Sequence, residues 1–193
     1  QQVKKQYNML TDSPGRTMFF FALPMILGNL FQQFYNIMDS VIVGRFVGEE
    51  ALASVGASYS VTNVFIAIAI GGGIGSAVIV SQFLGAGQMG KMKTAISTTL
   101  INFLCLSVIL GTVGYHMNGQ ILEWMNTPDN VMYDAAVYLK IYFVGLPFLF
   151  MYNVQAAVFN SLGGSKTPLW LLIFSSFLNI VLDLVFVISF GWG

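Results

Sequence analysis

Charged residues are scarce in this chain. Only 8% of its 193 residues are Asp, Glu, Lys or Arg, and the two signs balance at eight residues each. Soluble domains carry about 25% charged residues, so this scarcity excludes an ordinary water-soluble domain. The zero net charge excludes a strongly basic nucleic-acid-binding surface and an acidic tail.

Cysteine and histidine are nearly absent as well. Cys105, the single cysteine, lies in an apolar run, so a disulfide framework or a cysteine-rich metal site cannot form within the chain. With one histidine and no nucleophile motif, the sequence has no cluster typical of an enzyme, and we expect neither enzymatic activity nor a cofactor. The chain stops at Gly191-Trp192-Gly193, directly after an apolar stretch, and we expect it to be part of a larger protein.

Hydrophobic residues, by contrast, make up 56% of the chain, and its mean hydropathy is +0.75. About 20 apolar residues suffice to cross a bilayer as a helix. The sequence therefore predicts an all-α polytopic membrane protein, with a short connection at 44–50 and a polar connection from His116 to Asn130. The five predicted spans cover about 17–43, 52–85, 94–115, 131–162 and 168–189.

The basic residues between these spans predict the orientation of the chain. With the N-terminus inside the cell, six basic residues fall on the cytoplasmic side and Arg45 alone falls outside. This distribution follows the positive-inside rule, so we expect a multi-pass protein of the cell membrane with a cytoplasmic N-terminus. The six are Lys4, Lys5, Arg16, Lys91, Lys93 and Lys166.

Two aspartates, Asp39 and Asp183, lie inside the first and fifth predicted spans. A carboxylate within a membrane span costs about 2.5–3.5 kcal/mol on insertion scales, so such a residue is retained where it has a function. Under the predicted orientation both spans run from inside to outside, and each aspartate lies a few residues before the end of its span. At about 1.5 Å per residue, both are expected in the outer half of the membrane at similar depth.

Each aspartate ends a polar stripe on its own helix. Residues spaced by three or four share one helical face, and polar groups in lipid must turn toward protein or water. The stripes either line a cavity or form hydrogen bonds between helices, and Asn153 and Asn160 on the fourth span fit both interpretations. The stripes consist of Gln32, Tyr35, Asn36 and Asp39 on the first span and of Ser175, Ser176, Asn179 and Asp183 on the fifth.

Two carboxylates facing a cavity of restricted hydration can bind a cation. Desolvation and mutual repulsion favour the neutral acid, so a proton can bind and leave near physiological pH. Alternatively, carboxylate, amide and hydroxyl oxygens can surround a sodium ion. A simpler alternative is that each aspartate marks the end of a span and is hydrated by headgroup or loop water. All three interpretations stay open at this point.

Three sequence motifs resemble those of the multidrug and toxic compound extrusion (MATE) family of secondary transporters. The first span reads L-P-M-I-L-G-N-L-F-Q-Q-F-Y-N-I-M-D-S-V-I-V-G from Leu23 to Gly44, and L-A-S-V-G follows at 52–56. The segment L-G-G-S-K-T-P at 162–168 is similar to the family's L-G-D-T-K-T-P loop, with Gly164 where Asp is usual. The segment N-I-V-L-D at 179–183 resembles the family's N-x-x-x-D element. Together the motifs cover nearly the whole chain.

The resemblance implies a twelve-helix carrier made of two six-helix lobes. The chain, 1–193, would supply the first five helices of the N-terminal lobe, and its partners would be the missing C-terminal lobe, membrane lipid and a small organic substrate. Carriers of this family export organic, often cationic, compounds in exchange for protons or sodium. The resemblance places the cation site, including any sodium, at Asp39, Asn179 and Asp183. It assigns a hinge to Pro24, and Tyr35 and Asn153 would be neighbours of the site.

Two other functions are weighed against an ion-coupled antiporter. A flippase for lipid-linked precursors, from the same superfamily, should have a markedly basic cavity, and Lys140 and Arg45 are its only candidates here. A membrane scaffold or an integral membrane enzyme would leave the aspartates structural or catalytic, without a nucleophile motif beside them. The antiporter accounts for both aspartates, so we expect that function.

Overall fold

The computed structural model describes residues 14–190, and these residues form five long α-helices and no strand. Each helix is long and apolar enough to cross a membrane, so the predicted all-α polytopic fold is confirmed. Lys4 and Lys5 lie outside the described residues. The helices are α1 (Pro14–Ile42), α2 (Glu49–Gly85), α3 (Met89–Trp124), α4 (Asp129–Ser161) and α5 (Lys166–Leu184), and the π-helical segments η1 (Val43–Val47) and η2 (Val185–Ser189) extend α1 and α5.

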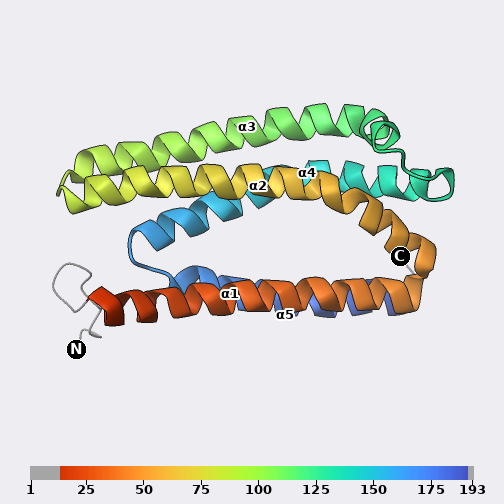
Figure 1. Ribbon diagram of the computed structural model, residues 1–193, viewed down its shortest axis with the longest axis horizontal. Helices are drawn as coiled ribbons and strands as arrows, with labels where there is room; N and C mark the ends of the chain where they lie inside the picture. The colour runs from red at the N-terminus through yellow and green to blue at the C-terminus, as the bar shows by residue number, and fades with distance from the viewer. Residues whose placement is uncertain (1–13, 191–193) are drawn as a thin grey trace.

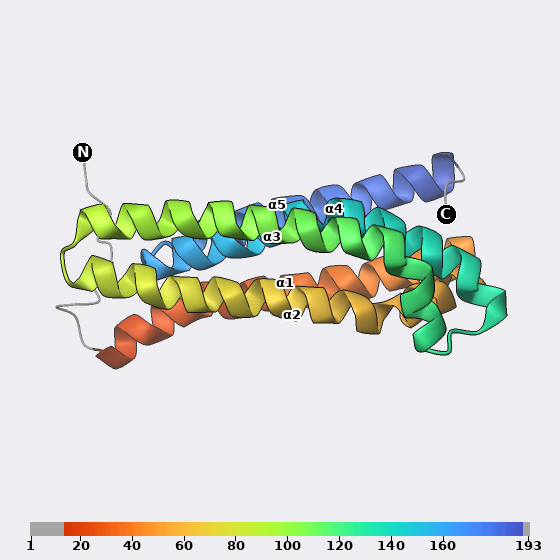
Figure 2. The same ribbon diagram turned by 90° about the horizontal axis from the view of Figure 1, so that it is seen from above.

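The helices fall into two groups, which Figure 1 shows one above the other, and Figure 2 shows the same helices from above. Helices α2, α3 and α4 pack as one bundle, and α1 and α5 lie side by side as a pair. The α2–α3 and α4–α5 loops lie at the same end of the molecule, which carries Lys91, Lys93 and Lys166 and is called the lysine end below. The α1–α2 and α3–α4 connections lie at the opposite end.

The three-helix bundle is held together by large apolar side chains that pack against glycines. Phe143 of α4 is 1% exposed and lies in the core with Leu139 and Phe150. A Cβ atom added at Gly114 of α3 would come within 2.3 Å of the Phe143 ring, so only glycine fits. Small residues let membrane helices approach closely, and here they allow α3 to lie directly on α4.

Helices α2 and α4 run parallel, and hydrogen bonds join them at two points. Near one end, the Ser54 hydroxyl donates a hydrogen bond to the Val131 carbonyl at 3.4 Å. Farther along, the Tyr142 hydroxyl donates to the Thr62 carbonyl at 3.2 Å. Hydrogen bonds between membrane helices contribute about 0.6 kcal/mol each on average, so packing supplies most of the stability and these bonds help to fix the register.

The α3 helix corrects one sequence prediction. The third span was predicted to end near Tyr115, with a polar connection beginning at His116, but α3 continues to Trp124. Two features extend it. The Asn118 side chain donates to the Tyr115 carbonyl, so its polar group is satisfied within the helix. Leu122 is fully buried in the core cluster, so the last turns of α3 are held by packing despite their polar sequence.

The connection between α1 and α2 is partly helical. Residues 44–50 were predicted to form a short connection, and within them helical structure continues as η1 through Val47. The turn is concentrated at Gly48, whose φ of 128° is accessible to glycine and strained for other residues. The amide of Gly48 donates to the Val43 carbonyl at 3.1 Å and closes the π-helical segment.

The outer surface of the helices is strongly apolar. Large side chains such as Phe148 (79% exposed) and Phe177 (69% exposed) lie on the surface of several helices. Contiguous apolar surface of this extent requires a cover of lipid or further protein. Together with the lengths of the five helices, this surface identifies a multi-pass membrane protein.

Candidate functional site

The contact between α1 and α5 brings the two membrane aspartates to the same depth. The two helices run in the same direction, and Gly28 of α1 lies opposite Leu172 of α5, whose Cδ2 would lie 3.6 Å from a Cβ added at Gly28. Asp39 follows Gly28 by 11 residues, and Asp183 follows Leu172 by the same number. Eleven residues make about three helical turns, or about 16 Å, so both aspartates return to the face on which the helices meet.

The two aspartates lie near each other and near Tyr35. Asp39 and Asp183 are both half-buried, and they are close enough for their charges to interact. The Tyr35 hydroxyl interacts with both carboxylates. These three residues, which the sequence assigned to a site on separate helices, are therefore brought together by the fold.

Tyr138 on α4 belongs to the same group, and the sequence did not point to it. Its hydroxyl interacts electrostatically with Asp39 and with Tyr35. A tyrosine near the start of a span has an ordinary interpretation as an interfacial residue, and its neighbours on the same face of α4, Asp134 and Tyr142, do not by themselves point to Asp39. Only the packing of the helices in three dimensions identifies this residue.

Three buried oxygen atoms on α5 have no hydrogen-bond partner. They are Ser176 Oγ, Asn179 Oδ1 and Asp183 Oδ2, and their spacing of three and four residues puts them on one face of the helix. An unpaired buried polar group costs about 1–3 kcal/mol. Oxygen atoms gathered in this way are suited to accept hydrogen bonds from water or to coordinate a cation.

Other residues predicted for the site lie elsewhere. Asn36 is exposed, donates to Gln33 Oε1 at 3.3 Å and lines a separate groove with Arg45 and Glu49. Ser175 is exposed too, and its hydroxyl donates to the Leu172 carbonyl at 3.1 Å. Neither residue faces the aspartate pair.

Gln32, Asn153 and Pro24 line a cavity of about 520 Å³ between the two groups of helices. Its walls come from α1, α2, α4 and α5, and Asn160 lies toward the lysine end of its α4 wall. Ligand pockets have volumes of about 300–1,000 Å³, so the size suits a small molecule or a group of waters. Pro24 lies on the α1 wall, within the helix.

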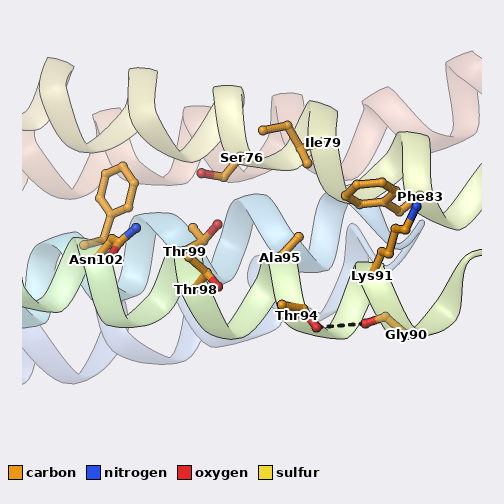
Figure 3. Close-up of a pocket in the computed structure, with 11 residues that line it drawn as sticks. Ser76, Ile79, Phe83, Gly90, Lys91, Thr94, Ala95, Thr98, Thr99 and Asn102 are labelled. Atoms are coloured by element: carbon orange, nitrogen blue, oxygen red, sulfur yellow. Dashed lines mark hydrogen bonds between the residues drawn. The ribbon is translucent and has the colours of Figure 1, made fainter.

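A larger groove of about 740 Å³ lies between α2 and α3 and contains no carboxylate. Figure 3 shows its side chains, with Thr94, Thr98 and Asn102 on α3 opposite Ser76, Ile79 and Phe83 on α2. Lys91 is its one charged residue. Without an anionic group, this groove has nothing to bind a coupling cation, and the aspartate pair remains the candidate site.

The donor set at the pair consists of oxygen atoms alone. Within residues 14–190, no group of three or more His, Cys, Asp or Glu side chains could hold a metal ion. Two carboxylates with an amide and a hydroxyl instead provide hard oxygen ligands, which suit a proton or a sodium ion better than a transition metal.

Comparisons with known proteins agree with this architecture. The chain is 34% identical over 181 residues to the probable multidrug resistance protein YoeA of Bacillus subtilis (strain 168). The matched region covers 93% of this chain and 39% of YoeA. It is 30% identical to YpnP, a probable multidrug resistance protein of the same organism, over 98% of this chain and 42% of YpnP. The chain therefore spans about two fifths of the length of these relatives.

The fold also matches a solved structure. The five helices superpose on a MOP superfamily transporter from Pyrococcus furiosus with a TM-score of 0.91 at 25% identity, covering all of this chain and 42% of that one. The model of the MatE family matches residues 24–185, a range that contains all five helices in whole or in large part and both aspartates. This chain therefore belongs to the MatE family.

Proposed function

We propose that the complete carrier exports organic, often cationic, compounds across the cell membrane in exchange for protons or sodium ions. The names of YoeA and YpnP support an efflux function. The main support for ion coupling is the aspartate pair. Asp39 and Asp183 are brought to one site from two helices, beside buried oxygens that have no partner within the described residues.

In this proposal the two aspartates bind the coupling cation and Asn179 assists through its amide oxygen. Two nearby carboxylates repel each other while both are ionised, and a bound proton or sodium ion removes that repulsion. Cation binding therefore favours an arrangement in which α1 and α5 lie close together. Tyr35, Ser176 and Tyr138 complete the polar surroundings of the pair.

Coupling then follows from unequal binding to two conformations. A ligand shifts an equilibrium only between states that it binds with different affinity. The cation and the organic substrate would favour opposite-facing states of the carrier, and Pro24 would let α1 change shape between them, because proline interrupts helical hydrogen bonding. The second lobe, absent from these 193 residues, would supply the other half of the substrate pathway.

The same proposal places the lysine end in the cytoplasm. Lys91, Lys93 and Lys166 all lie at that end of the bundle, whereas Arg45 lies at the other. Positive residues flanking membrane spans stay on the cytoplasmic side. The aspartate pair would then lie nearer the outer surface.

The experiment that tests the coupling uses the full-length carrier in proteoliposomes. Substrate efflux is measured under an imposed proton gradient and, separately, under an imposed sodium gradient. Asp39→Asn should reduce gradient-driven efflux to the level of empty liposomes while the protein still elutes as a folded monodisperse species. Asp134→Asn is the matched control, because Asp134 is an exposed aspartate on α4. Gradient-driven efflux by Asp39→Asn at the unmodified rate would contradict the proposal.

A further inference from the structure

The unpaired buried oxygens of the described residues lie on two neighbouring helices, α4 and α5. Within residues 14–190, four buried side-chain oxygens have no hydrogen-bond partner. Three belong to Ser176, Asn179 and Asp183 on one face of α5, and the fourth is Asn160 Oδ1 near the lysine end of α4. Buried polar groups are normally paired with protein or with ordered water. The three atoms on α5 and the one on α4 are therefore positions that water can satisfy.

The cavity between the helix groups connects the first of these atoms to the middle of the bundle. Asn160 lines it, together with three further amide side chains, Asn153, Gln32 and Asn29. Ser81, Ser161 and Ser165 add hydroxyl groups to its wall. A water molecule occupies about 30 Å³ of liquid, so a volume of about 520 Å³ has room for several.

The polar lining continues from the cavity to the aspartates on both neighbouring helices. On α1, the cavity wall ends at Gln32, and Tyr35 and Asp39 follow at the next two turns of the same face. On α5, the wall ends at Leu172, and Ser176 follows one turn later. Along α1, polar side chains therefore extend from the cavity at Gln32 to Asp39, whereas α5 is apolar from Pro168 to Phe174 and becomes polar only at Ser175 and Ser176.

We infer that this cavity is a hydrated passage through which the coupling cation leaves the Asp39–Asp183 pair toward the lysine end. The inference rests on the proposed function. An exchanged cation must reach water on both sides of the membrane, and the pair lies nearer the end opposite the lysines. The amide and hydroxyl groups of the passage replace part of the hydration shell of a monovalent cation and can hold the waters that carry a proton.

Most of the cavity wall is apolar, and its polar groups are neutral amides and hydroxyls. A carboxylate along the way would trap the cation, and a lysine would repel it. Neutral amides and hydroxyls offer oxygen ligands without net charge, so they permit entry and release. The lining residues of the cavity include no Asp, Glu, Lys or Arg.

Cysteine accessibility in the full-length carrier tests the passage without relying on transport. Cys105, which is exposed, is first replaced by alanine, as is any cysteine beyond residue 193. Asn153→Cys and Asn160→Cys are then treated with a membrane-impermeant, positively charged methanethiosulfonate, applied to one side of oriented vesicles at a time. Both should react from the lysine end, Asn160→Cys at least about tenfold faster than the control Phe159→Cys. Phe159 lies at the same depth on α4 and outside the cavity.

Sodium and the transported compound serve as protecting agents in the same assay. Sodium or low pH, whichever drives efflux, should slow labelling at Asn153→Cys, because it favours the state in which the pair is occupied. Protection by the organic compound alone would overturn the inference, since the cavity would then be a substrate pocket. Failure of both cysteines to react from the lysine end would overturn it too.

A block in the passage provides the second test. Ala156 lines the cavity, and Ala156→Phe should lower gradient-driven efflux at least about tenfold while cation binding to the solubilised carrier is retained. Asn160→Leu, which keeps the size of the side chain and removes its oxygen, tests the same point if the larger residue prevents folding. Full efflux by both variants would overturn the inference.

The failures of the two proposals give different results. If Asp39→Asn loses coupled efflux while Asn153→Cys and Asn160→Cys stay unreactive, the aspartates bind the cation and the passage is wrong. If the cysteines react but Asp39→Asn transports normally, the cavity is hydrated without being a route for the cation. In that case the inference falls together with the proposed function.

Discussion

Gly28 of α1 faces Leu172 of α5, and this contact sets the register of the two helices that carry the aspartates. A Cβ atom at Gly28 would lie 3.6 Å from Leu172 Cδ2 and 3.8 Å from Leu169 Cδ1, which are ordinary contact distances. The glycine therefore leaves room for a methyl group and for nothing larger without displacing α5. Asp39 and Asp183 lie eleven residues beyond this contact on their two helices, near enough for the charge of Asp39 to act on Asp183.

The first prediction follows from that spacing. Gly28→Ala should keep coupled efflux and stabilise the protein by up to about 1 kcal/mol, because alanine is the better helix former and its Cβ fits. Gly28→Phe should separate α1 from α5 and reduce cation-coupled efflux at least about tenfold. Unfolding midpoints and proteoliposome efflux measure the two effects. Equal behaviour of the alanine and phenylalanine variants would show that this contact does not position the aspartates.

The second prediction concerns the packing of α3 on α4. Gly114→Ala should destabilise the carrier by about 1–3 kcal/mol, as overpacking in a core does, because its Cβ would lie 2.3 Å from the Phe143 ring. Gly119→Ala on the same helix is the control, since nothing lies within 4 Å of a Cβ there. Thermal unfolding in detergent compares the two. Combining Gly114→Ala with Phe143→Leu should recover part of the loss.

The third prediction concerns the hydrogen bond that links α4 to α2. Tyr142→Phe removes the hydroxyl that donates to the Thr62 carbonyl and should cost about 0.5–1.5 kcal/mol. Tyr133→Phe, on the same helix and 78% exposed, should cost nothing measurable. A Tyr142→Phe variant as stable as the unmodified carrier would mean that this bond contributes nothing to holding the helices in register.

Most of the fold could be predicted from the sequence, because apolar length decides it. Each of the five segments has to satisfy its backbone hydrogen bonds internally once it is in lipid. Long apolar stretches of this kind therefore predict α-helices. The end of α3 was mispredicted for a tertiary reason. His116 begins a polar stretch, but Leu122, later in the same stretch, is buried against the other helices. The local sequence does not show which apolar residue of such a stretch will pack against another helix.

The site could be predicted in part. Helical periodicity assigned Asp39 to a face with Tyr35, and Asp183 to a face with Ser176, because both patterns are local. Tyr138 could not be found in this way, since its relation to Asp39 depends on how α4 packs. Asn36 was assigned to the stripe of Asp39 by a spacing of three, yet it lines another groove. Residues spaced by three or four along a helix spread over a broad arc of its surface. Packing can therefore place one of them, here Asn36, in a different groove from the others.

The fourth prediction tests whether Asp39 and Asp183 act as one site. In the full-length carrier, either Asp39→Asn or Asp183→Asn should weaken binding of the coupling cation at least about tenfold, a change of about 1.4 kcal/mol. Because the two carboxylates interact, the double variant should bind more tightly than the product of the two single effects predicts, with a coupling energy of about 0.5–3 kcal/mol. Cation titration of the purified variants measures each affinity. The pair Asp39→Asn and Asp134→Asn is the control and should be additive, because Asp134 is an exposed residue on α4, outside the α1–α5 pair. Additive effects at Asp39 and Asp183 would instead place two independent carboxylates in the membrane, and one shared cation could not then account for both.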